Sequence, residues 1–232
     1  MVARGVSVSV IIPALDEQST IARALRSTER PGVERIVVDG GSQDGTGETA
    51  RFLRAEKVIH SLPGRARQMD AGYREARGEI VLFLHADTAL GPGWLEALAE
   101  VAADPEVAGG AFRLRFAAEG RRFRLLERAV ALRCRLFRLP FGDQALFVRR
   151  KLLDEWGGFA PVPIFEDLDL VARIRARGRL AMLPVAAETS ARRYQRNGVV
   201  RTTTRHQLAL AAWKLGWERE RVARWYRGRP PR

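Results

Sequence analysis

The sequence predicts an α/β fold with a doubly wound, mostly parallel sheet in its first half and a mixed second half. Strand-like apolar runs alternate with helical patterns from residue 8 to about residue 103. These strands are apolar without a period of two, which is typical of parallel strands covered on both faces. The links between them are short and glycine-rich. The 232 residues, 46% of them hydrophobic, suffice for one large domain with its own core.

Strand and helix alternate regularly through the first half. Strands are expected at residues 8–13, 35–39, 57–60 and 79–85, and helices at residues 19–28, 46–54, 65–76 and 94–103. Ser19 is the expected N-cap of the first helix, because its hydroxyl can accept a hydrogen bond from a free backbone N–H of the first turn.

The pattern changes beyond residue 104. Residues 109–116 alternate like a strand with one wet face, and residues 144–150 resemble another. Further helices are expected from Glu166 and over residues 208–215. We expect a boundary near residues 104–110 that separates two halves of a single domain, 1–104 and 105–232, rather than two independent domains.

Residues 121–138 predict an amphipathic helix. One side carries Leu125, Leu126, Ala129, Leu132 and Leu136, and the other carries arginines. Such a helix can lie on an anionic membrane surface, but packing of the leucines into the fold is the favoured interpretation.

The chain is strongly basic, with a formal net charge of +13. This charge attracts nucleic acid, phosphorylated substrates or an anionic membrane surface without choosing among them. The apolar part of the N-terminus is too short for a signal peptide, and no apolar run approaches the roughly 20 residues of a membrane span. We expect a soluble, cytoplasmic protein.

The single cysteine, Cys134, has no metal-site spacing around it and is interpreted as structural.

Carboxylates follow strand-like runs or begin a helix at three places. Asp39 and Asp87 each follow an apolar run, and Glu166 with Asp167 begins a helix. An unpaired buried charge is costly, so these side chains are expected to face a crevice. In open α/β sheets ligands bind beyond the carboxyl ends of the strands. The sequence therefore predicts a ligand site beside Asp39 and Asp87.

Each carboxylate has a plausible chemistry. The glycines after Asp39 allow the backbone to approach a ligand closely, while Ser42 can either contact that ligand or cap the next helix. Asp87 suits Mg²⁺ or Mn²⁺ bridging a diphosphate. His85 can join as a nitrogen ligand, donate a hydrogen bond to a phosphate, or simply end the strand. A carboxylate of the Glu166–Asp167 pair can act as a general base toward a hydroxyl, although a helix N-terminus favours carboxylates in any case.

Taken together and in order, several motifs resemble the family 2 inverting glycosyltransferases with the GT-A fold. They are SVIIPALDE, IVVDGGSQDGT, GRARQMDAG, FLHADT, GDQALFVRR followed by GGF, and FEDLDL, and they cover most of the chain. The combination of GRARQM, FLHADT, PFGDQALFVRR and SARRYQRNG is more narrowly similar to a bacterial branch of small soluble members associated with radical-SAM or arsenosugar pathways.

The resemblance implies a nucleotide-sugar donor in the first half. Asp39 matches the aspartate that accepts hydrogen bonds from the nucleobase. A carboxylate can accept from N3–H of uracil or N1–H of guanine, so UDP and GDP sugars are favoured. The same resemblance places further residues around the donor nucleotide: Pro13, Ala14, Glu17, Gly41, Ser42 and Arg67.

It also implies roles on the acceptor side, in the half from residue 105. Asp167 matches the catalytic base, with Glu166 beside it, and Asp143 and Gln144 are expected to contact the donor sugar or the acceptor. Arg192 and Arg193 are expected to hold the leaving diphosphate. The expected acceptor is a small-molecule or lipid-linked hydroxyl compound, and transfer inverts the anomeric carbon in a single displacement.

The metal motif departs from the family pattern of two aspartates flanking one residue. Here it reads His85-Ala86-Asp87, so the first acid is missing. The resemblance still implies a divalent cation, Mn²⁺ or Mg²⁺, with Asp87 and His85 as the expected ligands.

Two other classes of protein are consistent with parts of the sequence. A basic nucleic-acid-binding module would account for the charge, but no reading motif is present and no specific nucleic acid is expected. A nucleotidyltransferase acting on a sugar phosphate shares the nucleotide-binding half and the acidic metal site. It would release pyrophosphate, whereas a glycosyltransferase would release UDP or GDP.

Overall fold

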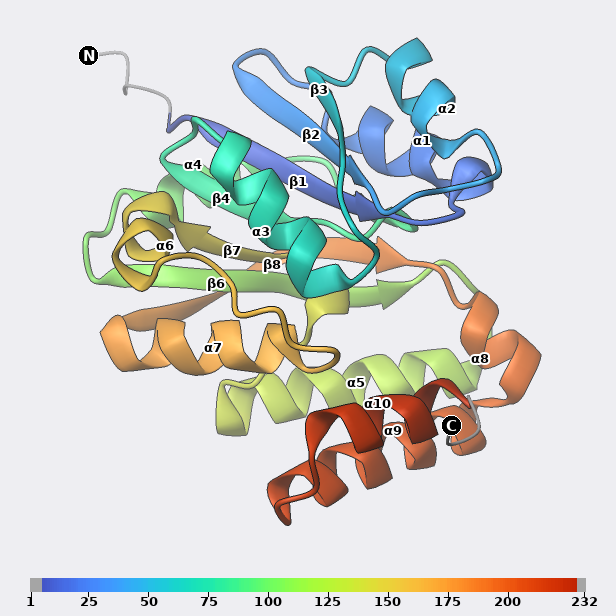
Figure 1. Cartoon of the computed structure of the whole chain (residues 1–232). Helices are drawn as coiled ribbons and strands as arrows, with labels where there is room; N and C mark the ends of the chain where they lie inside the picture. The colour runs from blue at the N-terminus through green and yellow to red at the C-terminus, as the bar shows by residue number, and fades with distance from the viewer. Residues whose placement is uncertain (1–5, 229–232) are drawn as a thin grey trace.

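The computed structural model describes residues 6–228, which form one eight-stranded sheet with the order β3-β2-β1-β4-β7-β6-β8-β5 (Figure 1). The strands are β1 (Val8–Ala14), β2 (Val33–Asp39), β3 (Lys57–His60), β4 (Ile80–Phe83), β5 (Thr88–Leu90), β6 (Val107–Phe116), β7 (Leu146–Arg149) and β8 (Arg179–Thr189). The helices are α1 (Gln18–Ser27), α2 (Thr46–Phe52), α3 (Arg65–Glu75), α4 (Trp94–Ala102), α5 (Arg121–Phe137), α6 (Arg150–Trp156), α7 (Glu166–Arg177), α8 (Arg192–Asn197), α9 (Val199–Lys214) and α10 (Arg219–Arg227), with a short 3₁₀ turn, η1 (Gly142–Gln144).

The sheet changes character at β4. Strands β3, β2, β1 and β4 run parallel, and β7 then pairs antiparallel with β4. The long β6–β8 ladder beyond it is parallel again. A Cβ on Gly110 of β6 would lie 2.1 Å from the carbonyl oxygen of Ala181, so this close ladder requires glycine. The predicted α/β fold, parallel first and mixed later, is confirmed.

Both faces of the parallel strands are buried, which explains why they lack a period of two. Val10 and Ile12 of β1 face a core that includes residues of α1, α2 and α4. Ile11, between them, faces a second core that includes residues of α3, α6 and α7. Helices therefore cover the sheet on both sides.

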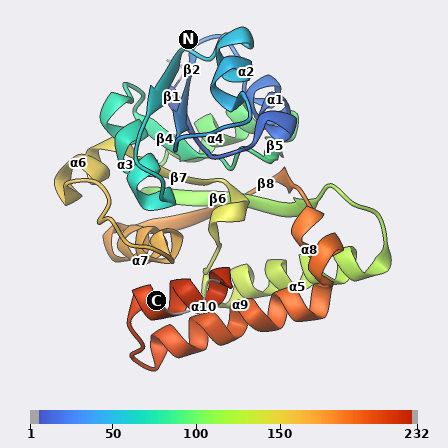
Figure 2. The same ribbon diagram turned by 45° about the vertical axis from the view of Figure 1, so that its right-hand side comes forward.

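A helical layer lies below the sheet, formed by α5, α9 and α10, with α8 leading into it (Figure 2). Phe165 and Leu168, at the start of α7, pack with Leu210 of α9 and Val222 of α10. Phe123 fastens α5 to the end of β6. Among residues 6–228 we find no helix whose length and apolar content would carry it through a bilayer.

Three expectations from the sequence are wrong. Helix α1 begins at Gln18, preceded by Glu17, so Ser19 lies inside the helix and does not cap it. The long strand β8 was not expected, because its burial does not alternate regularly along the strand. Three of the four leucines of α5 do not pack into the fold, whereas Leu126 packs against the cluster around Phe123. Leu125, Leu132 and Leu136 are 68%, 55% and 62% exposed, and the helix instead buries Phe123 and Cys134.

Candidate active site

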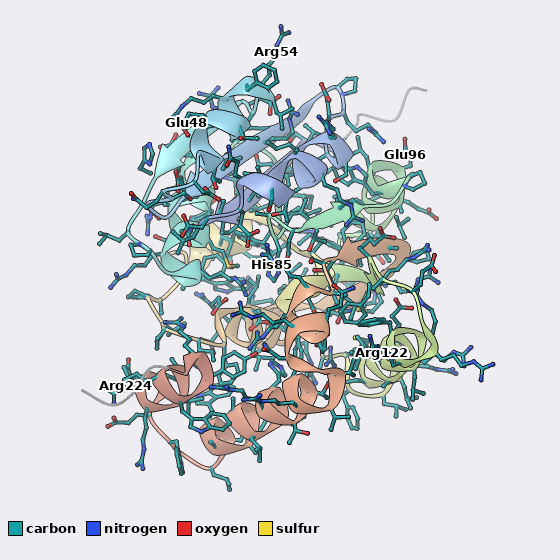
Figure 3. The ribbon with its side chains drawn as sticks, turned by 90° about the vertical axis from the view of Figure 1, so that its right-hand side faces the viewer. Glu48, Arg54, His85, Glu96, Arg122 and Arg224 are labelled. Carbon is teal, nitrogen blue, oxygen red and sulfur yellow. The ribbon has the colours of Figure 1, made fainter. Side chains whose placement is uncertain are left out.

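The polar residues singled out in the sequence gather where the parallel strands end. Asp39 ends β2, and His85 and Asp87 follow β4. Figure 3 shows His85 at the middle of the molecule, between the sheet and the helical layer. The start of α7, with Glu166 and Asp167, and the 3₁₀ turn η1 approach the same region from the second half of the chain.

Asp39 is 4% exposed and shapes the turn that follows it. Its Oδ1 accepts hydrogen bonds from the backbone N–H of Gly41 at 3.1 Å and of Ser42 at 2.8 Å. Its Oδ2 lies 3.9 Å from Nδ1 of His60, and a Cβ on Gly47 would lie 3.2 Å from it. One oxygen is thus committed to the turn, and the other has acceptor capacity left.

The loop after β1 is tied to the loop after β2. Ser42 Oγ accepts from the backbone N–H of Asp16 at 3.0 Å, and Thr46 Oγ1 accepts from that of Glu17 at 2.9 Å. The carbonyl of Ala14, next to Pro13 at the end of β1, accepts from Gly40 at 2.9 Å. Ser42 therefore has a structural partner, and its contact with a ligand stays a prediction.

Arg192 joins two carboxylates from different elements. Its guanidinium pairs with Oε1 of Glu17, and its Nη2 lies 3.5 Å from Oδ2 of Asp87. Arg192 thus lies beside Asp87, and its contact with a diphosphate stays a prediction. Arg193 points elsewhere, with its Cζ 4.6 Å from the centre of the Tyr226 ring. The structure separates these two neighbouring arginines.

The carboxylates of Asp87 and Glu17 lie close enough to favour a positive charge between them. Burial raises the pKa of Asp87, the Arg192 guanidinium opposes that rise, and the nearby Glu17 carboxylate adds to it. Among residues 6–228 no three His, Cys, Asp or Glu side chains form a group that could hold a metal by themselves. Mg²⁺, however, is commonly bound through one or two carboxylates together with substrate phosphates. Asp87 and Glu17 fit the protein's share of such a site.

The side chains of His85 and Asp167 both lie close to Gly142. A Cβ on Gly142 would be 3.1 Å from Nε2 of His85 and 3.3 Å from Oδ2 of Asp167, so glycine at 142 leaves room for both side chains. Burial, with a contribution from the Arg65 charge, lowers the pKa of His85 well below 6.5. The imidazole is therefore neutral at pH 7. Its role as a metal ligand stays a prediction.

Asp167 is held by backbone groups on both oxygens. Oδ2 accepts from the N–H of Gly142 at 2.8 Å, and Oδ1 accepts from the N–H of Leu168 at 2.9 Å. The residue before the pair, Phe165, has φ of 66°, a conformation that costs a non-glycine residue about 1–3 kcal/mol. Its ring stacks on Trp213 of α9 with centroids 5.1 Å apart. The helical layer thus helps to fix the start of α7.

Arg65 lies at the site although the sequence did not predict it there. Its Nε lies 3.7 Å from Oε1 of Glu166. Burial raises the pKa of Glu166, Arg65 opposes that rise, and Asp167 adds to it. Arg67, which was expected near the phosphates, is exposed on the same helix, and its contact with a ligand stays a prediction.

Asp143 and Gln144, neighbours in η1, have different surroundings. Gln144 is 1% exposed. Its amide donates to the carbonyl of Phe112 at 3.1 Å and accepts from Arg133 at 3.1 Å, so it holds η1 to β6 and α5. Its predicted contact with a substrate is not tested by these bonds. Oδ1 of Asp143, in contrast, is buried without a hydrogen-bond partner in the described structure.

The buried carboxyl of Asp143 gives a prediction about pH. Burial raises its pKa from 3.8 to about 6, with Arg133 opposing the rise and Asp167 adding to it. The folded state therefore keeps this proton to a higher pH than the unfolded chain does. The resulting stability is fully present below about pH 4 and is lost as the pH rises through about 6.

We expect Asp143→Asn to remove this pH dependence. Between pH 4 and pH 7.5 the wild type should lose roughly 3 kcal/mol more of its free energy of unfolding than the variant does. Urea unfolding at both pH values measures the difference. Parallel losses in the two proteins would contradict a raised pKa at Asp143.

A parallel sheet with acidic side chains at the ends of its strands is typical of enzymes that bind a nucleotide there. Comparison with known proteins identifies the family. Residues 9–165 match the model of the family described as Glycosyl transferase family 2. An uncharacterized protein of Mycobacterium tuberculosis is 30% identical over 246 residues, which cover 94% of this chain and 75% of that protein. The chain belongs to glycosyl transferase family 2.

Other relatives match over shorter regions. Glucosyl-3-phosphoglycerate synthase of Mycolicibacterium paratuberculosis is 35% identical over 96 residues, 36% of this chain and only 29% of that enzyme. Among solved structures, the mannosyltransferase PcManGT of Pyrobaculum calidifontis, in complex with GDP-Man and Mn²⁺, has a TM-score of 0.61 at 21% identity and covers 89% of this chain and 62% of that one. TarS of S. aureus with UDP-GlcNAc has a TM-score of 0.61 at 18% identity, covering 79% and 58%.

These likenesses confirm the predicted GT-A fold. The family match shows a glycosyltransferase of family 2. Two structural neighbours with this fold, PcManGT and glucosyl-3-phosphoglycerate synthase from Mycobacterium tuberculosis, have been solved with Mn²⁺.

Proposed function

We propose that this chain transfers a sugar from a UDP or GDP sugar to an acceptor hydroxyl, with inversion, in a single displacement. One observation carries the proposal: three acidic positions, each in different surroundings, lie near the carboxyl ends of the parallel strands. Asp39 lies in the turn after β2, Asp87 pairs with Arg192, and Asp167 lies at the start of α7.

Asp39 is the proposed nucleobase-binding residue. Its Oδ1 orders the Gly41–Ser42 turn, and the acceptor capacity of the carboxylate suits the ring N–H of uracil or guanine. The solved relatives named above contain UDP-GlcNAc and GDP-Man, so both nucleotides are compatible with this fold. The loop at Pro13, Ala14 and Glu17 would line the same nucleotide.

Arg192 and the carboxylates beside it would serve the leaving diphosphate. Its guanidinium supplies positive charge where negative charge develops during departure. A divalent cation, when bound, would add a Lewis acid at the same place, and Asp87 with Glu17 would hold it. Mn²⁺ in the structures of two relatives supports this assignment. His85 remains a proposed additional ligand.

Asp167 is the proposed general base. Two backbone N–H groups orient its carboxylate, and each oxygen keeps a lone pair for an acceptor hydroxyl. Asp167 would remove the hydroxyl proton as the oxygen attacks the anomeric carbon opposite the diphosphate. Glu166 and Arg65 flank it, and the unpartnered Oδ1 of Asp143 is a proposed contact to the acceptor or the donor sugar.

The proposed acceptor is a small-molecule or lipid-linked hydroxyl compound. One solved relative, glucosyl-3-phosphoglycerate synthase, was obtained with phosphoglyceric acid, whereas other relatives are named as undecaprenyl-phosphate transferases. The motifs GRARQM, FLHADT, PFGDQALFVRR and SARRYQRNG further support the small bacterial branch associated with radical-SAM or arsenosugar pathways.

Thermal-shift measurements with UDP, GDP, CDP and ADP sugars, with and without Mn²⁺ or Mg²⁺, test the donor assignment. We expect a uridine or guanosine species to raise the melting temperature of the wild type. Asp39→Ala should abolish most of this shift, because the nucleobase loses its acceptor. The matched control is Asp70→Ala, which removes a carboxylate that pairs with Arg74 on α3.

Two results would contradict the proposal. One is the absence of stabilisation by any nucleotide sugar, and the other is an unchanged shift in Asp39→Ala. Release of pyrophosphate from a nucleoside triphosphate would instead identify a nucleotidyltransferase, and tighter binding to random DNA than to any nucleotide would identify a nucleic-acid-binding module.

A further inference from the structure

Helix α5 has apolar side chains on two opposite sides. Its inner side carries Phe123 and Cys134, both buried in the fold. Its outer side carries Leu125, Leu132 and Leu136, which are more than half exposed. Spacings of seven and eleven residues correspond to about two and three helical turns, so the three leucines form one stripe. More than half of each of these leucines faces solvent.

Arginines border the leucine stripe. Arg121, Arg128 and Arg135 are exposed and repeat every seven residues, which places them along one side of Leu125 and Leu132. Long arginine side chains can lie along an apolar surface and keep their charges in water. The outer side of α5 therefore presents a narrow apolar stripe beside a row of positive charge.

Acidic groups do not balance this row. The only acid within α5 is Glu127, and it points toward the fold. Its Oε1 accepts from the backbone N–H of Phe116 at 2.7 Å, and its Oε2 pairs with Arg124 at 2.8 Å. The charge of the outer side is thus purely positive along the helix.

Exposed apolar side chains also concentrate in this part of the molecule. Of thirteen exposed large hydrophobic residues within 6–228, nine lie between residues 125 and 137 or between 200 and 225, in the segments that build the helical layer. In Figure 3 Arg54 of the first half lies at the top of the molecule and Arg122 of α5 lies on its lower right flank. Most of the exposed large hydrophobic residues therefore lie in the helical layer.

We propose that the outer side of α5 binds an anionic lipid surface, with the leucine stripe inserted among the acyl chains and the arginines at the headgroups. A helix with leucines on one side and arginines beside them is typical of segments that lie in a membrane interface. A second copy of the chain fits less well, because two such sides facing each other would oppose arginine to arginine. This inference does not depend on the transfer reaction, since binding to lipid requires no donor.

Vesicle co-sedimentation of the full chain tests the proposal. The wild type should bind vesicles that contain phosphatidylglycerol and bind pure phosphatidylcholine vesicles weakly, and added salt should weaken the binding. Leu132→Gln with Leu136→Gln should reduce the partition coefficient about tenfold or more. Phe52→Gln, at an 84% exposed position on α2, is the matched apolar control and should bind as the wild type does.

A second pair of variants tests the charge. Arg128→Gln with Arg135→Gln should also weaken binding about tenfold or more. Arg54→Gln with Arg77→Gln removes the same charge from exposed positions in the first half and should have little effect. All substituted positions are exposed, and melting temperatures verify that each variant folds.

Three results would overturn the proposal: no binding to anionic vesicles, equal binding to neutral ones, or equal binding by all variants. Loss of a dimer in Leu132→Gln with Leu136→Gln, seen by sedimentation velocity with lipid binding unchanged, would assign the stripe to a second copy instead.

Discussion

Asp167→Asn will leave donor binding intact and lower sugar transfer by about 10²- to 10⁴-fold, the range that a general base contributes. Asparagine is nearly the same size, and its one carbonyl oxygen can keep one of the two hydrogen bonds from Gly142 and Leu168. It cannot take a proton from the acceptor hydroxyl. The thermal shift with the donor should therefore persist, while release of UDP or GDP in the presence of acceptor falls.

Asp169→Asn is the control for this variant. Asp169 lies on the same helix, but both of its oxygens accept from Arg219, at 2.5 and 2.7 Å. We expect transfer to remain close to that of the wild type. Turnover by Asp167→Asn within a few-fold of the wild type would remove Asp167 from the role of base.

Arg192→Gln should lower the rate of transfer by about 10²- to 10³-fold, as loss of one donor to developing negative charge commonly does. The guanidinium pairs with Glu17 and lies 3.5 Å from Asp87, so its removal also leaves two carboxylates facing each other. Steady-state release of UDP or GDP measures the change.

Arg193→Gln is the natural control, because Arg193 carries the same charge one residue later and stacks on Tyr226. It should have a much smaller effect. If Arg192→Gln transfers as well as the wild type and binds Mn²⁺ more tightly, the guanidinium only fills the place of a cation and contributes nothing to the reaction.

The first four strands could be predicted from the sequence because burial constrains their composition strongly. Strands buried on both faces are apolar throughout, and Val10, Ile11 and Ile12 are each 0% exposed. Asp39 and Asp87 interrupt this apolar pattern at the points where strands end, so their position near one edge also followed from the sequence.

The other features of the site could not be predicted, because they depend on contacts between residues that are distant in the sequence. Arg65 and Arg67 are chemically alike and two positions apart, and only the tertiary structure shows that Arg65 reaches Glu166. Arg192 meets Glu17 across 175 positions of sequence. Helix α5 was misinterpreted because the sequence shows that leucines share a side, but not which side meets the fold.

The pairing of β5 with β8 has a consequence for how such enzymes diversify. Thr88 Oγ1 donates to Thr189 Oγ1 at 2.9 Å, and the carbonyl of Asp87 accepts from the N–H of Ser190 at 3.1 Å. Strand β5, from the first half, thus forms the far edge of the sheet. Ser190, the partner of Asp87, lies two residues before Arg192. The two halves therefore cannot be exchanged independently without changing these contacts. We expect that joining residues 1–104 to the second half of a relative would replace one partner of the Thr88–Thr189 contact, which lies three residues before Arg192, and would displace the guanidinium beside Asp87.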